Sequence, residues 1–103
     1  MGYTSVDAAI RDWCKARRLK LFTRFAGEER RFCYASSDDG ECFQISVEPP
    51  TGSEIVVNAW SIEKNDDEEL HDVWQVATSD LKGGLDLALA RIEEWKARPA
   101  GGR

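Results

Sequence analysis

The fold is decided by the stretch CFQISVEPPTGSEIVVNAWSIE, residues 42–63, because it holds two strand patterns and the turn that separates them. In CFQISV, residues 42–47, large apolar side chains alternate with smaller or polar ones, which is the period of a strand with one buried face. Residues 49–53, PPTGS, end this strand because proline donates no ladder hydrogen bond and glycine suits a turn. Residues 54–63 are apolar on both faces and predict a central strand.

The same period of two continues on both sides of this stretch. Further strands are predicted at LFTRF, RFCYAS and LHDVWQVAT, which are residues 21–25, 31–36 and 70–78. The segments between the strands are short and polar, and one of them contains Asp39-Gly40, a strong hairpin signal. Five strands joined by short links predict a sequential antiparallel meander.

A helical pattern precedes the strands, in TSVDAAIRDWCKARR. Its apolar residues recur at helical spacing and are Val6, Ala9, Ile10, Trp13 and Cys14. Thr4 or Ser5 can serve as the N-cap, and Thr4 with Asp7 resembles a capping box. We expect this helix to run from Ser5 to Leu19.

A second helical pattern follows the strands and begins near Ser79 or Asp80, both of which are good N-caps. Its apolar stripe is formed by Leu81, Leu85, Ala88, Leu89, Ile92 and Trp95. Gly83 and Gly84 lie inside this segment, and each costs about 1 kcal/mol in a helix relative to alanine. Either the helix begins at Leu85, or the glycines let its first turn lie close against the sheet.

The element order α-β-β-β-β-β-α predicts an α+β fold of two layers, an antiparallel meander sheet of about five strands with the N- and C-terminal helices packed on one face. We expect a single domain over residues 1–98 and a disordered C-terminal tail over residues 99–103. No apolar run approaches the roughly 20 residues that a membrane span needs, so no membrane partner is expected. The tryptophans at positions 13, 60, 74 and 95 are predicted to be core residues, because each lies on an apolar stripe.

The three cysteines, Cys14, Cys33 and Cys42, have spacings that match no zinc-binding pattern. We expect three buried thiols in a reducing compartment and therefore a cytoplasmic protein. A redox-active pair of Cys33 and Cys42 is the competing interpretation, although nothing nearby in the sequence would lower a thiol pKa. No metal ion or other cofactor is expected.

His71, the single histidine, lies among several carboxylates in EKNDDEELHDVWQV, residues 63–76. Metal binding needs converging ligands, but this segment has neither a second histidine nor the glycine of a calcium-binding loop. On a strand, His71 and Asp72 point to opposite faces, so they are not expected to form an acid–base pair. The sequence also lacks the GxGxxG, GxSxG and P-loop motifs, so an enzyme is the minority interpretation and no catalytic residue is assigned.

Charge is unevenly distributed along the chain, whose formal net charge is −5. Residues 32–80 contain 12 acidic side chains and one basic side chain, Lys64, whereas residues 1–31 contain 8 basic and 4 acidic side chains. The predicted strands and turns therefore form a strongly negative surface, which affects the choice of partner more than it affects the fold. Alternatively, the basic first helix pairs with acidic loops of the same molecule.

The sequence favours a small soluble intracellular protein of non-enzymatic role, which binds a protein partner through an acidic sheet and loop surface. This partner is expected to be a basic protein or a second copy of the chain. The candidate partner-binding residues are Trp60, Asp66, Asp67, Glu68, Glu69, His71 and Asp72.

Three alternative functions stay open. The first is an immunity- or antitoxin-like inhibitor of a basic toxin. The second is a small-molecule-binding or enzymatic domain with a pocket near Trp60 and Trp74. The third is nucleic-acid binding through the basic patch of the first helical region, Lys15, Arg17, Arg18, Lys20 and Arg24. Nucleic acid is the least favoured partner, since a sequence pI of about 4.9 is far below that of typical nucleic-acid-binding domains.

Overall fold

The structure is a computed structural model that describes residues 3–36, 42–61 and 70–97 of the 103-residue chain. In this part of the chain two helices and five strands follow one another, with a short 3₁₀ turn, η1, before the second helix. The bounds are α1 Asp7–Ala16, β1 Phe22–Phe25, β2 Glu28–Ser36, β3 Cys42–Val47, β4 Glu54–Ser61, β5 His71–Ala77, η1 Thr78–Asp80 and α2 Leu81–Ala97.

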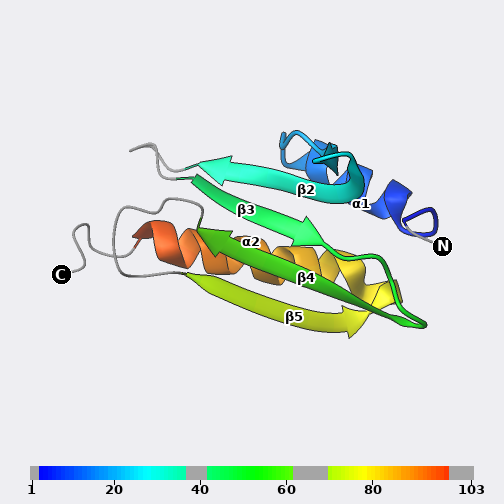
Figure 1. Cartoon of the computed structure of the whole chain (residues 1–103). Coiled ribbons are helices and arrows are strands. Elements are labelled where there is room, and N and C mark those ends of the chain that lie inside the picture. Colours follow the sequence, from blue (N-terminus) through cyan, green and yellow to red (C-terminus); the bar gives the residue numbers. More distant parts are fainter. Residues whose placement is uncertain (1–2, 37–41, 62–69, 98–103) are drawn as a thin grey trace.

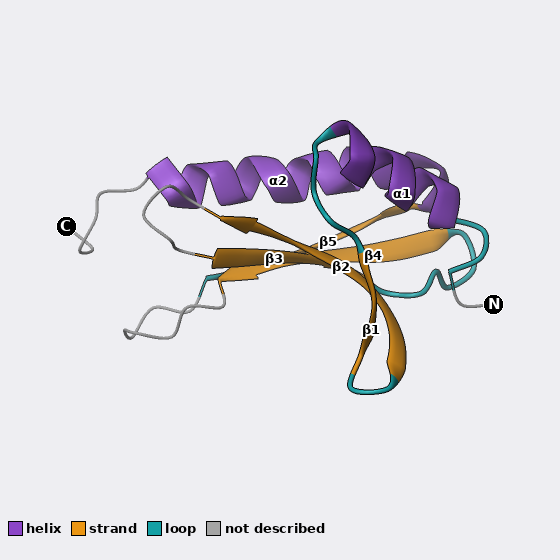
Figure 2. Ribbon diagram, turned by 90° about the horizontal axis from the view of Figure 1, so that it is seen from above, coloured by secondary structure: helices purple, strands orange, loops and turns teal. Residues whose placement is uncertain are grey.

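The five strands form one antiparallel sheet in the order β1-β2-β3-β4-β5, so each strand pairs with its neighbour in the sequence. Both helices lie on the same face of this sheet (Figure 1 and Figure 2). The predicted α+β fold, a five-stranded meander with terminal helices on one face, is therefore confirmed. Neither of these two helices is long and apolar enough to cross a membrane.

The core lies between the helices and the sheet face that they cover. Along β3, buried side chains alternate with half-buried ones, as the period of two predicts. The strand residues that reach the core from β3 and β4 are Phe43, Ile45, Val47, Ile55, Val57 and Ala59, each at most 4 % exposed. From α2 the core receives Leu81, Leu85, Ala88 and Ile92. This apolar contact area supplies the main driving force for packing the two layers together.

Close approach of α2 to the sheet depends on a glycine in its first turns. A Cβ atom added at Gly84 would lie 3.0 Å from Val76 Cγ2 and 3.4 Å from Val57 Cγ2. Because glycine has no side chain, the helix can begin at Leu81 and still lie directly on β4 and β5. Of the two alternatives stated above for this helix, the early start with close approach is confirmed.

The C-terminal end of α1 lies at Ala16 rather than at the predicted Leu19. Arg18 adopts a left-handed conformation with φ 59°, and its N–H donates to the carbonyl of Lys15 at 3.1 Å. The N–H of Leu19 donates to the carbonyl of Cys14 at 2.9 Å. These two bonds form a Schellman motif, with arginine at the position that glycine usually takes.

The N-terminal end of α1 also differs from the prediction. The helix begins at Asp7 rather than Ser5, with Val6 as the N-cap and no hydrogen bond from a capping side chain. The predicted capping box of Thr4 and Asp7 is therefore wrong. The Asp7 carboxylate bonds instead to Arg31 of β2, so a long-range ion pair takes the place of the expected local contact.

Three of the four tryptophans lie on the helix side of the sheet. Trp13 is 2 % exposed, and Trp74 packs against the core. Trp95 stacks on Phe43, with 5.9 Å between the ring centroids. Trp60 is half-buried and projects from the opposite face of β4, so the prediction that all four tryptophans are core residues is wrong for Trp60. Because β4 is apolar on both faces, its sequence could not tell which side the helices cover.

Candidate functional site

The candidate functional site is the open face of the sheet, the surface formed by alternate side chains of β2 to β5 that no described helix covers (Figure 2). The strand register places two rows of side chains across this surface. One row consists of Tyr34, Gln44, Trp60 and His71, and the next consists of Phe32, Ser46, Asn58 and Val73. The open face therefore brings together two of the predicted partner-binding residues, Trp60 and His71.

A hollow of about 490 Å³ lies on the open face. Its lining includes two aromatic side chains and four polar ones, namely Phe32, Trp60, Gln44, Ser46, Glu48 and Asn58. A volume of several hundred Å³ and apolar walls with a few polar groups are typical of ligand-binding clefts. We refer to this cleft as the Trp60 hollow.

A hydrogen-bonded chain of three side chains crosses the open face beside the Trp60 hollow. Asn58 Nδ2 donates to Glu48 Oε2 at 3.2 Å, and Asn58 Oδ1 is 3.3 Å from His71 Nε2. Since Asn58 Oδ1 can only accept, His71 Nε2 carries the hydrogen. Asn58 is 6 % exposed although it lies on the open face, and these two bonds pair its amide oxygen and one of its two amide hydrogens. No feature of the sequence pattern predicts that Asn58 is buried.

Trp60 and His71 occupy directly paired positions on β4 and β5. Their ring centroids are 5.1 Å apart and the ring planes are nearly perpendicular, at 86°. The imidazole therefore meets the indole edge-to-face, which is a favoured geometry for aromatic pairs. This contact, together with the bond to Asn58, fixes His71 at the margin of the open face.

Glu48 is the acidic group of the Trp60 hollow. Its side chain is held by Asn58, and among the described residues no lysine, arginine or histidine lies within ion-pair distance of it. Glu48 directly follows β3, and its backbone N–H donates to the carbonyl of Val56 at 3.0 Å. The carboxylate is thus held by Asn58 without an ion pair to a described residue. Arg30 and Arg31 line the same hollow, and their guanidinium groups pair with other carboxylates, those of Glu28, Asp7 and Glu29.

Asp72 lies on the other face of β5 from His71, as the alternation of side chains predicts. Its carboxylate pairs with Arg91 of α2 at 2.9 Å and belongs to the contact between helix and sheet. Asp72 therefore does not join the open face. The other predicted partner-binding residues, Asp66, Asp67, Glu68 and Glu69, lie outside the described residues.

Among the histidine, cysteine, aspartate and glutamate side chains of the described residues, no group of three or more converges as metal ligands would. His71 makes its contacts with Trp60 and Asn58, as given above, and not with a cluster of carboxylates.

An aromatic cluster occupies the end of the open face next to β1. Phe22 stacks on Phe32 at 5.2 Å between centroids, and Tyr34 meets both rings edge-on at 5.4 and 5.6 Å. The bend of the β1–β2 hairpin away from the helices is visible in Figure 2. Sequence reasoning had not assigned Phe32 or Tyr34 to a site, although their period of two on β2 was a usable signal.

Arg31 borders the Trp60 hollow but is committed to other contacts. Its Nε donates to Asp7 Oδ1 at 2.6 Å, and its Nη2 donates to Glu29 Oε2 at 3.0 Å. The guanidinium carbon also lies 4.5 Å from the ring centroid of Tyr3. The hydrogen bond from Arg31 lowers the pKa of the Asp7 carboxyl, because it stabilises the charged form. Arg31 thus joins α1 to β2 and offers no unpaired charge to a ligand.

The predicted basic patch is partly used within the fold. Arg17 pairs with Asp86 of α2 at 2.8 Å and lies 4.5 Å from the ring centroid of Trp13. The ammonium group of Lys20 lies 5.2 Å from the ring centroid of Phe22. The remaining members of the patch are exposed at the end of α1 and on β1, and they are Lys15, Arg18 and Arg24.

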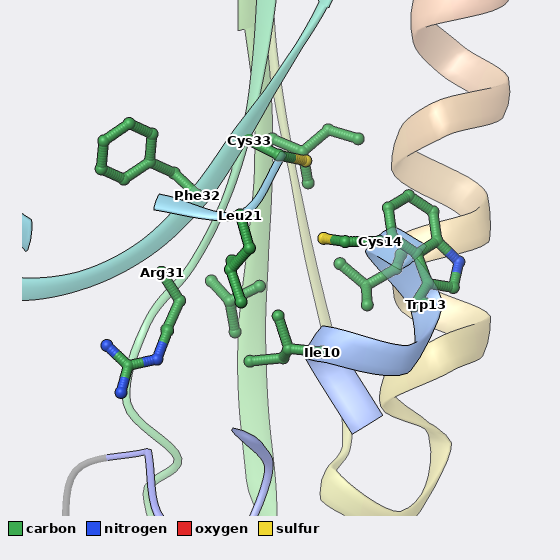
Figure 3. Close-up of a pocket in the computed structure, with 10 residues that line it drawn as sticks. Ile10, Trp13, Cys14, Leu21, Arg31, Phe32 and Cys33 are labelled. Atoms are coloured by element: carbon green, nitrogen blue, oxygen red, sulfur yellow. The ribbon is translucent and has the colours of Figure 1, made fainter. Parts of the chain in front are cut away.

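Two of the three thiols meet in the core. Cys14 of α1 and Cys33 of β2 are buried, and Figure 3 shows their sulfur atoms turned toward one another. A hydrogen bond from the Cys33 thiol to Cys14 lowers the pKa of Cys14 and raises that of Cys33. Cys42 is only half-buried and lies on the open side of β3, so the expectation of three buried thiols is wrong for Cys42. The competing interpretation, a pair of Cys33 and Cys42, is also wrong, because these side chains project from opposite faces of the sheet.

No protein-family model matches the chain, and neither a curated protein nor a solved structure matches it. The function is therefore argued from the side chains of the open face. Among these, the fixed carboxylate of Glu48 beside a partly exposed indole is the arrangement with the clearest chemistry.

Proposed function

We propose that the protein binds a basic protein partner through the open face, and that a lysine or arginine side chain of the partner enters the Trp60 hollow. The observation that carries this proposal is the pairing of two groups in one cleft. Glu48 supplies a negative charge that forms no ion pair with a described residue, and Trp60 supplies an aromatic face. The two arginines that line the same hollow are paired with other carboxylates, Arg30 with Glu28 and Arg31 with Asp7 and Glu29.

Both groups are suited to a cationic side chain. A guanidinium or ammonium group over an indole ring gains about 0.5–2 kcal/mol, depending on how much water is excluded. A carboxylate held by a neighbouring amide adds a charge-assisted hydrogen bond and loses little side-chain entropy on binding. Since Asn58 holds Glu48 and His71 holds Asn58, the recognition group is already in place before the partner arrives.

Charge complementarity supports a basic partner over a neutral one. Residues 32–80, which include β3, β4 and β5, contain 12 acidic side chains and a single basic one. Such a field raises the association rate of a positively charged partner and disfavours acidic ones. The run Asp66–Glu69 stands directly before Leu70 and His71 in the sequence and adds four of these charges.

Two neighbouring functions are variants of this proposal. An immunity- or antitoxin-like inhibitor is the case in which the basic partner is a toxin. A small-molecule site is the case in which an organic amine or guanidinium compound fills the Trp60 hollow by itself. The hollow is lined by Trp60 and not by Trp74, because these two side chains project from opposite faces of the sheet. We also place the protein in the cytoplasm, a location that suits three free thiols.

Calorimetric titration with defined peptides tests the proposal. The probes are a decapeptide with alternating arginine and glycine, the same peptide with glutamate in place of arginine, and free arginine amide. We expect the arginine peptide to bind, the glutamate peptide to give no heat of binding, and affinity to fall as salt is raised.

The variant Glu48→Gln removes the charge of the hollow and is expected to weaken binding of the arginine peptide by about fivefold or more. Glu93→Gln is the matched control, since it changes the net charge equally on an exposed position of α2. Equal affinity of the two variants would contradict a specific role for the hollow. Binding of arginine amide as tightly as of the peptide would favour the small-molecule function.

A further inference from the structure

The outer edge of β5 carries backbone groups that pair with no other described segment. The N–H of Thr78 donates to the carbonyl of Ser53 at 2.8 Å, and the N–H of Ser61 donates to the carbonyl of Leu70 at 2.9 Å. The β4–β5 register is continuous between these bonds, so the residues of β5 alternate between pairing inward and pointing outward. The outward set consists of His71, Val73, Gln75 and Ala77.

This edge lacks the features that usually protect an edge strand. β5 is seven residues long, contains no proline or lysine, and has no register shift against β4. The opposite edge of the sheet is different, because β1 has four residues, includes Arg24, and shows a register shift against β2. Within the described part of the chain, no segment pairs with the outer side of β5.

Exposed apolar side chains lie on both sides of the same edge. Among the described residues the large hydrophobic side chains that are most exposed are Val73, at 53 %, and Leu87, at 49 %. Val73 projects from β5 onto the open face. Leu87 lies on α2 one turn before Arg91, whose guanidinium pairs with Asp72 of β5, so Leu87 is on the flank of α2 that faces β5.

We infer that β5 pairs with β5 of a second copy of the chain, forming a continuous ten-stranded sheet in which Leu87 of one copy packs against Leu87 of the other. The two strands run antiparallel about a two-fold axis beside Trp74. The outward-pointing residues then bond to one another, Val73 to Gln75 and His71 to Ala77 of the second copy, and no like charges are placed opposite each other.

The helix layer fits this arrangement. α2 runs antiparallel to β5, with Gly84 against Val76 and Arg91 near Asp72, so Leu87 lies close to the level of Trp74 and of the axis. Because α2 packs on β4 and β5, its axis lies about one strand spacing, roughly 4.8 Å, from the two-fold axis. The two copies of α2 would then be about 10 Å apart, which is within the usual distance for packed helices.

A second copy is favoured over an unrelated strand because the surface is self-complementary. An isologous interface needs each patch to match itself, and here the two exposed apolar side chains lie on opposite sides of one strand at nearly the same level. This inference does not depend on the proposed function. It would place two Trp60 hollows on the same side of one sheet.

Sedimentation equilibrium of the full-length chain, over about three decades of concentration, measures the association directly. We expect a reversible shift from the 11.6 kDa monomer to twice that mass. Val73→Pro removes an outward N–H that β4 does not use, and Leu87→Glu places two charges face to face across the axis. Each is expected to weaken dimerisation by about tenfold or more.

The control for Leu87→Glu is Ala97→Glu, an exposed position at the C-terminal end of α2. If Val73→Pro fails to fold, as judged by circular dichroism, Val73→Lys is the second variant. It places a positive charge of each copy at the proposed β5–β5 contact and should weaken dimerisation. A chain that stays monomeric throughout overturns the inference, as does a dimer that Val73 and Leu87 variants leave intact. Such a monomer could still bind the arginine peptide, so the two proposals fail independently.

Cross-linking tests the position of the axis. In a Cys42→Ser background, Leu87→Cys is expected to form a disulfide-linked dimer on mild air oxidation, and Ala97→Cys, at the C-terminal end of α2, is not. Equal cross-linking at both positions would overturn the axis beside Trp74.

Discussion

The two faces of the sheet are built from the same strands but differ in what their side chains contact. On the helix side, Phe43 and Val57 are fully buried in a continuous apolar cluster. On the open face, Trp60 is only half-buried, and the buried Asn58 side chain forms hydrogen bonds with Glu48 and His71. The difference teaches that the apolar side chains of a strand such as β4 stabilise the core on one face, whereas on the other face they leave a half-buried indole beside hydrogen-bonded polar groups.

The largest expected effect is on stability, and it is measured by truncating two neighbouring residues of β3. Phe43 points to the helix side of the sheet and Gln44 points to the open face. Phe43→Ala should lower the free energy of unfolding by about 3–5 kcal/mol, because it leaves a cavity beneath Trp95. Gln44→Ala, on the open face, should lower it by less than about 1 kcal/mol. Urea unfolding of both variants measures the two values, and similar losses would break the distinction between the faces.

The difference between the open face and the core should also appear in the rates at which the three thiols react with a disulfide reagent. Cys42 is half-buried on the open side of β3, whereas Cys14 and Cys33 are closed inside the core. With an aromatic disulfide reagent, Cys42 should react at least about 100-fold faster than the other two, which require local opening of the fold. The Cys42→Ser variant should lose the fast phase, and a fast phase that persists in it would show that α1 does not seal the core.

The ion pair between α1 and β2 should appear in the pH dependence of stability. Arg31 lowers the pKa of Asp7 below its ordinary value of 3.8, so the stabilisation is complete above that pH and is lost as the pH falls through the folded-state pKa. Asp7→Asn should cost about 1–2 kcal/mol at pH 7 and make the loss of stability below pH 4 shallower. Asp12→Asn, an exposed carboxylate on the same helix, is the control and should change neither quantity appreciably.

The smallest expected effect is a gain in stability at the end of α1. Arg18 holds a left-handed conformation that glycine adopts without strain, so Arg18→Gly should raise the free energy of unfolding by about 0.5–1 kcal/mol. Lys15→Gly, within the helix, should lower it by about 1 kcal/mol. Thermal unfolding measures whether Arg18→Gly stabilises the fold and Lys15→Gly destabilises it. Peptide binding at the open face should be unaffected by either change.

Periodicity was sufficient to predict the elements and their layers. The period of two located all five strands, and the helical stripes located α1 and α2, because these patterns are local. The predicted ends of α1 are less accurate. Asp7 pairs with Arg31 instead of forming a local cap, and Arg18 adopts a left-handed conformation that is unusual for arginine.

The site was harder to predict because its parts meet through strand pairing. Glu48, Asn58 and His71 belong to different strands or their ends, and only the register brings them together. The sequence offers Trp60 both as a candidate contact residue and as a core residue, since a strand that is apolar on both faces does not reveal which face is covered.

The central claim is that the open face is the binding surface, and the four tryptophan indole N–H signals test it most directly. In a nitrogen-15 NMR titration with the arginine peptide, we expect the Trp60 signal and the Asn58 side-chain amide to shift together and saturate. The signals of Trp13 and Trp95, on the helix side, should stay in place. Shifts at Trp13 or Trp95 with Trp60 unmoved would contradict the account.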